Sequence, residues 1–344
     1  MADKEKEGLM SASLQEEDKK EDSVLRPNTL SGFMGQEKVK DNLRIFIDAA
    51  KKRGEALDHT FLSAPPGLGK TTLAGIIASE MNVPIRYTSA PVLEKPKDLA
   101  GILTNLTENS IFFIDEIHRL RPALEEMLYI AMEDFELDWV VGQGPSARTM
   151  RVPLSPFTLI GATTKAGGVS QPLYSRFGIT LRLEFYTEDE LSLIVRRNEK
   201  LLGIEFTDEA MHILARSSRG TPRITNRLIR RLRDFASSVN TTVIDEALIR
   251  EALCRLEINE NGLEAQDLNI LRNIIEYYGG GPVGAETLAI SIGESIDTLE
   301  DFYEPYLIQC GYLRRTARGR VATQKAYELL NINGGGNAGF GLFV

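Results

Sequence analysis

A glycine-rich loop between two regular segments constrains the fold of this chain more than any other feature. Residues 64–72 read A-P-P-G-L-G-K-T-T, and they lie between the short apolar stretch Thr60–Ser63 and a helix-like run from Thr71 to Met81. Strand, loop and helix in this order form the context of a phosphate-binding loop. Further strands and helices alternate along the chain, so we expect a parallel sheet wrapped by helices.

Each residue type in the loop suits contact with phosphate. Gly67 and Gly69 let backbone N–H groups face phosphate oxygens. Lys70 supplies a positive charge near the β- and γ-phosphates, and Thr71 supplies a hydroxyl for magnesium. The N-terminal end of the following helix adds partial positive charge. Ala64 occupies the position where such loops usually begin with glycine, and we expect alanine to be tolerated there if its φ is negative.

A second motif supports the same interpretation. The apolar run Ile111–Ile114 is followed directly by Asp115 and Glu116. The first carboxylate could hold magnesium, and the second could act as a general base on the attacking water. A glycine-rich turn before a helix can arise by chance, but the combination of both motifs favours binding and hydrolysis of a nucleoside triphosphate.

Length and composition set the remaining bounds. A chain of 344 residues predicts two or three domains, and its 42% hydrophobic and 26% charged residues are typical of globular proteins. No apolar run approaches the ~20 residues of a membrane span, and the N-terminus lacks an apolar signal core, so we expect a cytoplasmic protein that does not contact membranes. The two cysteines and three histidines show no metal-binding spacing.

The charge distribution is uneven. A net charge of −9 argues against a surface coated with nucleic-acid-binding residues. Residues 310–325 nevertheless contain five basic residues and no acidic one. Such a run could follow a phosphate backbone without reading bases, or it could be a solvated charged hairpin.

Composition and periodicity divide the chain into five segments. We expect a disordered acidic tail at 1–22, an α/β domain at 23–186 with a β-hairpin at 135–154, a helical domain at 187–257, three helices and a hairpin at 258–332, and a flexible tail at 333–344. The four residues T-E-D-E from Thr187 predict a capping box at the start of the helical domain. Three helices followed by a hairpin are typical of a winged helix.

Four polar residues could complete a nucleotide site, although each has a simpler explanation. Thr163 and Thr164 end an apolar strand and could sense the γ-phosphate, but a threonine at a strand end is more often a turn former. Arg176 could stabilise charge on the transferred phosphoryl group from a neighbouring subunit, or it could form a surface ion pair. Arg223 begins a helix, where a cation is disfavoured unless an anion lies nearby; the alternative is an exposed arginine.

An ordered set of motifs resembles one known family. The motifs include L-R-P at 25–27, P-P-G-L-G-K-T-T at 65–72, F-I-D-E-I-H-R-L at 113–120, A-M-E-D-F at 131–135, F-T-L-I-G-A-T-T at 157–164, R-F-G-I at 176–179, R-G-T-P-R-I at 219–224 and R-G-R-V-A-T at 318–323. Together they resemble the RuvB family of AAA+ ATPases, bacterial motors of Holliday-junction branch migration. The resemblance extends from Leu25 to about Leu330, and Ala317 departs from it because proline is common there.

The resemblance implies both a fold and a function. The fold would be an α/β P-loop AAA+ large ATPase domain, a small all-helical lid domain and a C-terminal winged-helix domain that binds DNA. The function would be that of an ATP-driven hexameric motor that pumps duplex DNA to drive branch migration in recombination and repair, with ATP and Mg²⁺ as cofactors. The implied partners are double-stranded DNA at Holliday junctions, RuvA docked on the hairpin at 135–154, the RuvC resolvase and further copies of the chain in a homohexamer.

The resemblance also implies roles for individual residues. Magnesium would be held by Thr71 and Asp115. Catalysis would involve Asp115, Glu116, Thr163 or Thr164 as a first sensor, and Arg176 as an arginine finger in trans. The nucleotide would be bound by Leu25, Arg26, Gly67, Leu68, Gly69, Lys70, Thr71, Thr72, Glu133, Asp134, Phe135, Tyr186 and Arg223, the last acting as a second sensor. Arg315 and Arg320 match the family's DNA-contacting arginines.

Two other functions fit parts of the sequence. A clamp-loader-type AAA+ subunit would share the ATPase motifs, but such proteins usually end in a helical collar rather than a basic winged domain. A non-enzymatic winged-helix regulator could use nucleotide as a switch. Glu116 argues against this second alternative, because a pure switch needs no residue that activates water.

Overall fold

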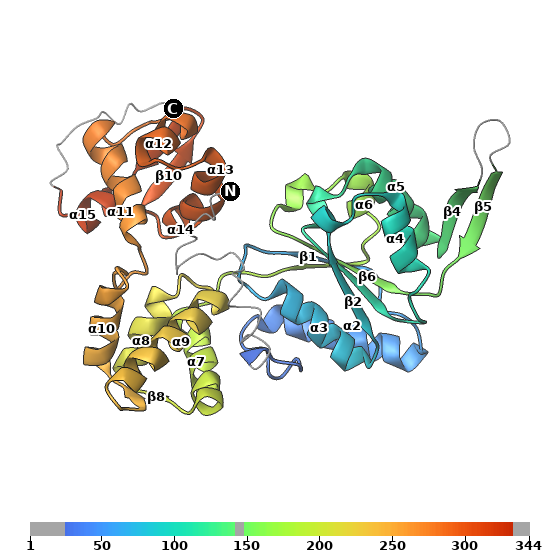
Figure 1. The fold of residues 1–344 in the computed structure, drawn as a ribbon, viewed down its shortest axis with the longest axis horizontal. Coiled ribbons are helices and arrows are strands. Elements are labelled where there is room, and N and C mark those ends of the chain that lie inside the picture. The colour runs from blue at the N-terminus through green and yellow to red at the C-terminus, as the bar shows by residue number, and fades with distance from the viewer. Residues whose placement is uncertain (1–24, 142–147, 333–344) are drawn as a thin grey trace. The chain divides into compact units, whose positions relative to one another are not determined.

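The computed structural model describes residues 25–141 and 148–332 (Figure 1). The predicted tails at 1–22 and 333–344 and the tip of the predicted hairpin lie outside this part. The described chain separates into two compact units, which we treat individually. The α/β unit contains residues up to 202 together with 220–226, and the helical unit contains 203–219 and everything from 227 onward.

A five-stranded parallel sheet forms the centre of the α/β unit. Its strand order is β2-β3-β6-β1-β7, and each neighbouring pair is parallel. The central strands are short and almost entirely buried, as expected for strands covered on both faces. The five strands are β1 (Thr60–Ser63), β2 (Ile85–Ser89), β3 (Ile111–Asp115), β6 (Thr158–Thr163) and β7 (Ile179–Arg182). The predicted parallel α/β sheet is therefore confirmed.

Helices cover both faces of this sheet. Figure 1 shows α2 (Glu37–Arg53) and α3 (Lys70–Met81) on one face, and α4 (Pro96–Leu103), α5 (Pro122–Glu133) and α6 (Gln171–Tyr174) on the other. The second group packs on a core that includes the buried side chains of Phe61, Phe112, Leu128 and Phe157. Three short 3₁₀ turns also lie in this unit, η1 (Ala90–Val92), η2 (Ile117–Arg119) and η4 (Ala166–Gly168).

His59 connects three of these elements just before β1. Its Nδ1 accepts a hydrogen bond from the backbone N–H of Leu159 at 2.9 Å. Its Nε2 lies 3.0 Å from the carbonyl oxygen of Met132 and must therefore carry the hydrogen. Burial is the main reason that the pKa of His59 lies below its ordinary value. The ring is thus fixed as the neutral form that bridges α5 and β6.

A β-hairpin extends from the α/β unit, as the sequence predicts. It consists of β4 (Glu136–Val141) and β5 (Arg148–Pro153), which pair in antiparallel register. Trp139 lies opposite Met150, and both side chains are exposed. In Figure 1 the hairpin projects away from the sheet.

Helices dominate the chain after β7. They are α7 (Glu188–Leu202), α8 (Asp208–Ser217), α9 (Pro222–Ser238) and α10 (Glu246–Arg255), with a two-residue parallel pairing of β8 (Glu205–Phe206) and β9 (Val243–Ile244). The predicted capping box at the start of α7 is present. The backbone N–H of Glu190 donates to the Thr187 hydroxyl, and the N–H of Thr187 donates to the Glu190 carboxylate.

The last part of the helical unit has its own apolar core and ends in a small hairpin. Its elements are α11 (Ala265–Arg272), η5 (Asn273–Tyr277), α12 (Ala285–Ile292), α13 (Ile296–Thr298), η6 (Leu299–Tyr303), α14 (Glu304–Gln309), β10 (Leu313–Thr316), β11 (Gly319–Ala322) and α15 (Gln324–Leu329). Pro305 lies in the first turn of α14, where its missing N–H costs nothing, and the π-helical turn η6 precedes it. The chain nevertheless stays helical without a break from Ile296 to Gln309, with the π-helical turn just before Pro305.

A buried ion pair stabilises the helical unit. Arg219 has a left-handed φ of 53° after α8, and its guanidinium donates to Asp267 in α11. Arg219 also donates to the carbonyl oxygen of Gly262 and stacks on the ring of Tyr306, with its guanidinium carbon 4.8 Å from the ring centre. Both charged side chains are almost fully buried, at 4% and 0% exposure.

Candidate nucleotide-binding site

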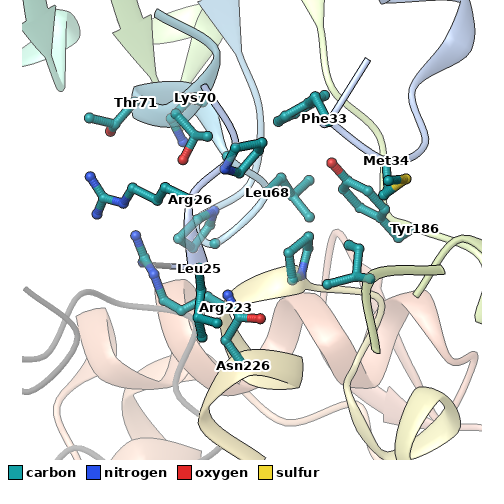
Figure 2. A pocket seen from close by; sticks show the side chains of 18 of the residues that line it. Leu25, Arg26, Phe33, Met34, Leu68, Lys70, Thr71, Tyr186, Arg223 and Asn226 are labelled. Atoms are coloured by element: carbon teal, nitrogen blue, oxygen red, sulfur yellow. The ribbon is translucent and has the colours of Figure 1, made fainter. Parts of the chain in front are cut away.

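A cavity of about 510 Å³ lies in the α/β unit beside the glycine-rich loop. Its walls come from the N-terminal segment, the loop and α3, the end of β3, and the helices α7 and α9. Figure 2 shows Arg26 and Arg223 toward one side of the view, and Met34 and Tyr186 toward the other. The predicted nucleotide residues that line the cavity are Leu25, Arg26, Gly67, Leu68, Gly69, Lys70, Thr71, Thr72, Asp115, Glu116, Thr164, Tyr186 and Arg223.

The loop has the backbone conformation that its glycines predict. Gly67 and Gly69 have φ angles of 83° and 99°, which favour glycine over any residue with a side chain. Ala64 is buried, does not have a positive φ, and donates its N–H to the carbonyl oxygen of Thr163. The expectation that alanine fits the first loop position is therefore confirmed. Helix α3 begins at Lys70, so the backbone N–H groups of its first turn lie at the cavity.

Lys70 is a buried cation held by the loop itself. Its Nζ donates to the carbonyl oxygens of Ala64 at 2.8 Å and Pro65 at 3.3 Å. Burial lowers the pKa of Lys70 to about 8, against the opposing effect of Glu116 and Asp115, while Arg223 lowers it further. Because burial has removed much of its hydration, this ammonium group would gain strongly from a nearby anion.

Two carboxylates lie at the end of β3 and line the same cavity as the loop. Asp115 ends the strand, and the backbone N–H of Glu116 donates to its Oδ1 at 3.0 Å. Burial and the neighbouring Glu116 raise the pKa of Asp115, while Lys70 and Arg223 oppose this rise. A cation beside Asp115 would relieve the repulsion between the two carboxylates.

The residues present fit magnesium. Thr71 and Asp115 line the same cavity and offer a hydroxyl and a carboxylate, and Mg²⁺ prefers such oxygen ligands. No cluster of three or more His, Cys, Asp or Glu that could hold a metal occurs in residues 25–141 and 148–332.

The two threonines that end β6 have different surroundings. Thr164 lines the cavity, and its hydroxyl donates to Glu116 Oε2 at 3.0 Å. Thr163 is buried outside the cavity lining, with its Oγ1 2.8 Å from Nδ1 of His118. Of the two sensor candidates, Thr164 is therefore the one in the cavity lining.

Arg176 and the segment E-D-F at 133–135 lie outside the cavity lining. Arg176 forms an ion pair with Glu133, with Nη2 3.2 Å from Oε2, and its guanidinium carbon lies 4.7 Å from the centre of the Tyr129 ring. Asp134 caps the end of α5, and Phe135 packs against His59 and Phe157. The structure therefore brings Arg176 and Glu133 together, but away from the residues that surround the cavity.

The two wing arginines have acidic neighbours that the local sequence does not reveal. Arg320 is 6% exposed and pairs with Glu304 and Glu300, and Arg315 also pairs with Glu300. Both glutamates precede the basic run, in η6 and α14. The fold therefore brings two carboxylates to the run at 310–325, which itself contains no acid. Arg315 retains 52% exposure of its side chain.

Comparison with known proteins identifies the family. Three family models match this chain: the Holliday junction DNA helicase RuvB P-loop domain at 25–183, the RuvB AAA lid domain at 186–259 and the RuvB C-terminal winged helix domain at 260–331. The chain belongs to the RuvB family.

Individual RuvB proteins are similar over most of their length. The Holliday junction branch migration complex subunit RuvB of Treponema denticola is 64% identical over 91% of both chains. The same subunit of Borreliella burgdorferi is 60% identical over 91% of this chain and 90% of its own. A solved structure described as the Thermotoga maritima RuvB Holliday junction branch migration motor is 49% identical, with a TM-score of 0.82 over 90% of this chain and 99% of that chain.

Several residues that line the cavity of this RuvB-family chain were not predicted from the sequence. Phe33 and Met34 lie in an irregular segment, while Arg197 and Asn226 lie on helices. Arg197 donates to the carbonyl oxygen of Leu25 at 2.6 Å, and Asn226 accepts from Asn198. A polar residue on an amphipathic helix gives no local signal that it faces a cavity, because the same pattern describes a solvated face.

The described residues contain no helix long and apolar enough to cross a membrane.

Proposed function

We propose that this chain is an ATP-driven motor that moves duplex DNA through Holliday junctions in recombination and repair. One observation carries the proposal: a phosphate loop, a buried lysine and two carboxylates line a single cavity in a chain that belongs to the RuvB family. The proposed domains are an ATPase domain at 23–186, a lid at 187–257 and a winged-helix domain at 258–332.

The cavity residues divide the work of ATP hydrolysis. Gly67, Gly69 and Lys70 bind phosphate oxygens through loop N–H groups and the ammonium group. Thr71 and Asp115 would hold Mg²⁺, which neutralises phosphate charge when it is bound. Glu116 takes a proton from the attacking water. The water oxygen bonds to the γ-phosphorus while the bond between that phosphorus and the bridging oxygen of ADP breaks. Thr164 donates to the γ-phosphate, and Leu25, Arg26, Leu68, Thr72, Tyr186 and Arg223 fix the rest of the nucleotide.

Arg176 acts on the nucleotide of a neighbouring subunit in a homohexamer. Its place outside the cavity of its own chain supports this role. The E-D-F segment, Glu133 to Phe135, lies with Arg176 and would face the same neighbouring nucleotide. An arginine supplied in trans stabilises the charge that develops on the transferred phosphoryl group.

The remaining partners contact other parts of the chain. Arg315, with its exposed guanidinium, contacts the phosphate backbone of double-stranded DNA, and Arg320 supports the same wing. The hairpin at 135–154 docks RuvA, and its exposed Trp139 and Met150 offer an apolar surface for that contact. The RuvC resolvase would join at the junction.

A pair of variants tests the ATPase assignment. Lys70→Ala should abolish ATP binding, because it removes the charge that meets the phosphates in the ground state. Glu116→Gln should keep ATP binding and lower turnover by ~10²–10⁴-fold, because it removes only the general base. Wild-type turnover in Glu116→Gln would contradict the role of Glu116.

Dissolution of a four-way DNA junction tests the motor. The wild-type protein should dissolve the junction only when ATP, Mg²⁺ and RuvA are all present, and Glu116→Gln should bind the junction without dissolving it. ATP-independent dissolution, or none with an active ATPase and bound RuvA, would contradict the proposal.

A further inference from the structure

The carboxylate of Glu116 is held through only one of its two oxygens. Oε2 accepts from the Thr164 hydroxyl at 3.0 Å and from the Thr164 backbone N–H at 3.4 Å. Nδ1 of His118 lies 3.2 Å from the same oxygen. Among the residues that the structure describes, Oε1 has no hydrogen-bond partner. This arrangement fixes the carboxylate and leaves one oxygen available to a water molecule.

The backbone brings Glu116 and His118 together. Glu116 has a left-handed φ of 50°, and the 3₁₀ turn η2 begins immediately after it. A non-glycine residue adopts this conformation at a cost and keeps it only where the surroundings enforce it. The turn lets side chains two residues apart meet at one carboxylate oxygen.

The partners of the His118 ring determine where its hydrogen lies. Nδ1 faces Oε2 of Glu116 and Oγ1 of Thr163, the latter at 2.8 Å. A carboxylate oxygen can only accept and would repel a lone pair on Nδ1 at 3.2 Å, so the hydrogen is favoured on Nδ1, where it bonds to Thr163 Oγ1 and faces Glu116 Oε2. The Thr163 oxygen also accepts from the N–H of Lys165 at 3.0 Å, which holds the threonine in place beside the ring. The side chain of His118 is only 14% exposed, so water competes little with these contacts of Nδ1.

We propose that His118 is a positioning residue that holds Glu116 for catalysis. The hydroxyl of Thr164 has a single hydrogen, so it can donate either to Glu116 or to a phosphate oxygen. Once a γ-phosphate takes that hydrogen, the long contact from the Thr164 N–H and the 3.2 Å contact with Nδ1 of His118 are what hold Oε2. His118 keeps its proton throughout and never touches substrate. This inference rests on the proposed role of Glu116 as the general base.

Two variants of His118 separate positioning from a structural role. Asparagine places an N–H donor close to where Nδ1 of histidine lies, whereas alanine removes the donor. His118→Ala should lower kcat for ATP by roughly 10- to 100-fold, the range expected for loss of a close polar contact to a charged group. The affinity for ATP should stay within about twofold, and His118→Asn should recover kcat to within about fivefold of wild type.

Three kinetic outcomes would overturn this inference. They are wild-type kcat in His118→Ala, equal losses in the alanine and asparagine variants, and a loss that appears in ATP affinity rather than in kcat. Unfolding temperatures of both variants should match the wild type, and a kcat loss that follows a lower unfolding temperature would equally count against positioning.

A double variant separates this inference from the proposed function. If His118 acts through Glu116, adding His118→Ala to Glu116→Gln should cause no further loss of turnover. A further loss would show that His118 acts elsewhere. Wild-type turnover in Glu116→Gln would defeat the proposed base itself, whereas a strong Glu116→Gln effect beside an unaffected His118→Ala would defeat only the positioning role.

A spectroscopic measurement needs neither nucleotide nor activity. The chain has three histidines, so ¹⁵N-labelled imidazole signals can be assigned by comparison with His118→Asn. In the nucleotide-free protein near neutral pH, His118 should carry its hydrogen on Nδ1. Finding the hydrogen on Nε2 alone would contradict a favourable contact between Nδ1 and Glu116.

Discussion

Arg320 and Glu304 form a buried ion pair that joins β11 to the first turn of α14. Nε of Arg320 lies 2.5 Å from Oε1 of Glu304, and the two side chains are 7% and 1% exposed. Glu300 lies beside them, and the pKa of its carboxyl is lowered mainly by the hydrogen bond from Arg320. Arg320 therefore helps to hold the winged helix together, whatever else it contacts.

The stability of the winged helix should depend on Arg320 far more than on Arg315. Arg320→Ala leaves the buried Glu304 with only a 4.0 Å contact to Arg315 as counter-charge, so it should lower the free energy of unfolding by about 3–5 kcal/mol. Arg315→Ala removes a half-exposed partner of Glu300 and should cost less than about 1 kcal/mol. Urea unfolding followed by circular dichroism measures both. Similar losses in the two variants would contradict the distinction.

DNA binding should report on Arg315. The logarithm of affinity for duplex DNA should fall linearly with the logarithm of salt concentration. Arg315→Ala should lower that slope by about one unit, because the variant makes one phosphate contact fewer and so releases about one counterion fewer. Two duplexes of unrelated sequence should behave alike. Lys325→Ala, which changes the same charge at an exposed residue of the same domain, is the matched control. An unchanged slope in Arg315→Ala, or a strong preference between the duplexes, would contradict the backbone contact.

Acid should destabilise the α/β unit through His59. Because the pKa of His59 is lowered in the folded protein, the unfolded chain binds the additional proton first as pH falls below about 6.5. The neutral ring's contribution is therefore present above pH 6.5 and is lost progressively as the pH falls below it. The unfolding temperature of His59→Gln should depend less on pH between 7.5 and 5.5 than that of the wild type. His212→Gln, at an exposed histidine, should keep the wild-type dependence.

Mixed oligomers should reveal whether Arg176 acts in trans. Lys70→Ala and Arg176→Ala are each expected to be inactive alone, since an arginine finger contributes ~10³–10⁵-fold to turnover. When the two variants are mixed, some interfaces combine an intact phosphate loop with an intact Arg176, so part of the ATPase activity should return. Native mass spectrometry should establish co-assembly. Mixed assemblies that form but stay inactive would argue against the trans role.

Sequence reasoning succeeded where a feature depends on residues that are close in the chain. The loop at 64–72, the pair Asp115 and Glu116 and the capping box at Thr187 each depend on a few neighbouring residues, and the structure has the expected geometry at all three. Backbone conformation and hydrogen bonding over such short stretches follow directly from residue type.

Features that depend on tertiary packing were less accessible. The carboxylates that pair with Arg320 lie 16 and 20 residues earlier, so a count of acids within the wing could not find them. Arg197 and Asn226 reach the cavity because of how α7 and α9 pack, not because of any local pattern. The contacts of the His118 ring with Glu116 and Thr163 could not be predicted from the sequence, because they depend on how the turn after β3 packs beside β6.

The buried pair of Arg219 and Asp267 has a consequence for evolution. Burial raises the pKa of Asp267, while Arg219 opposes that rise and keeps the carboxylate compatible with its apolar surroundings. A change in either residue alone would leave the other charge without compensation in the interior, at a cost of several kcal/mol. Substitutions at these two positions must therefore occur together. Related chains should carry both charges or neither, and chimaeras that combine one charged position with one neutral position should fold poorly.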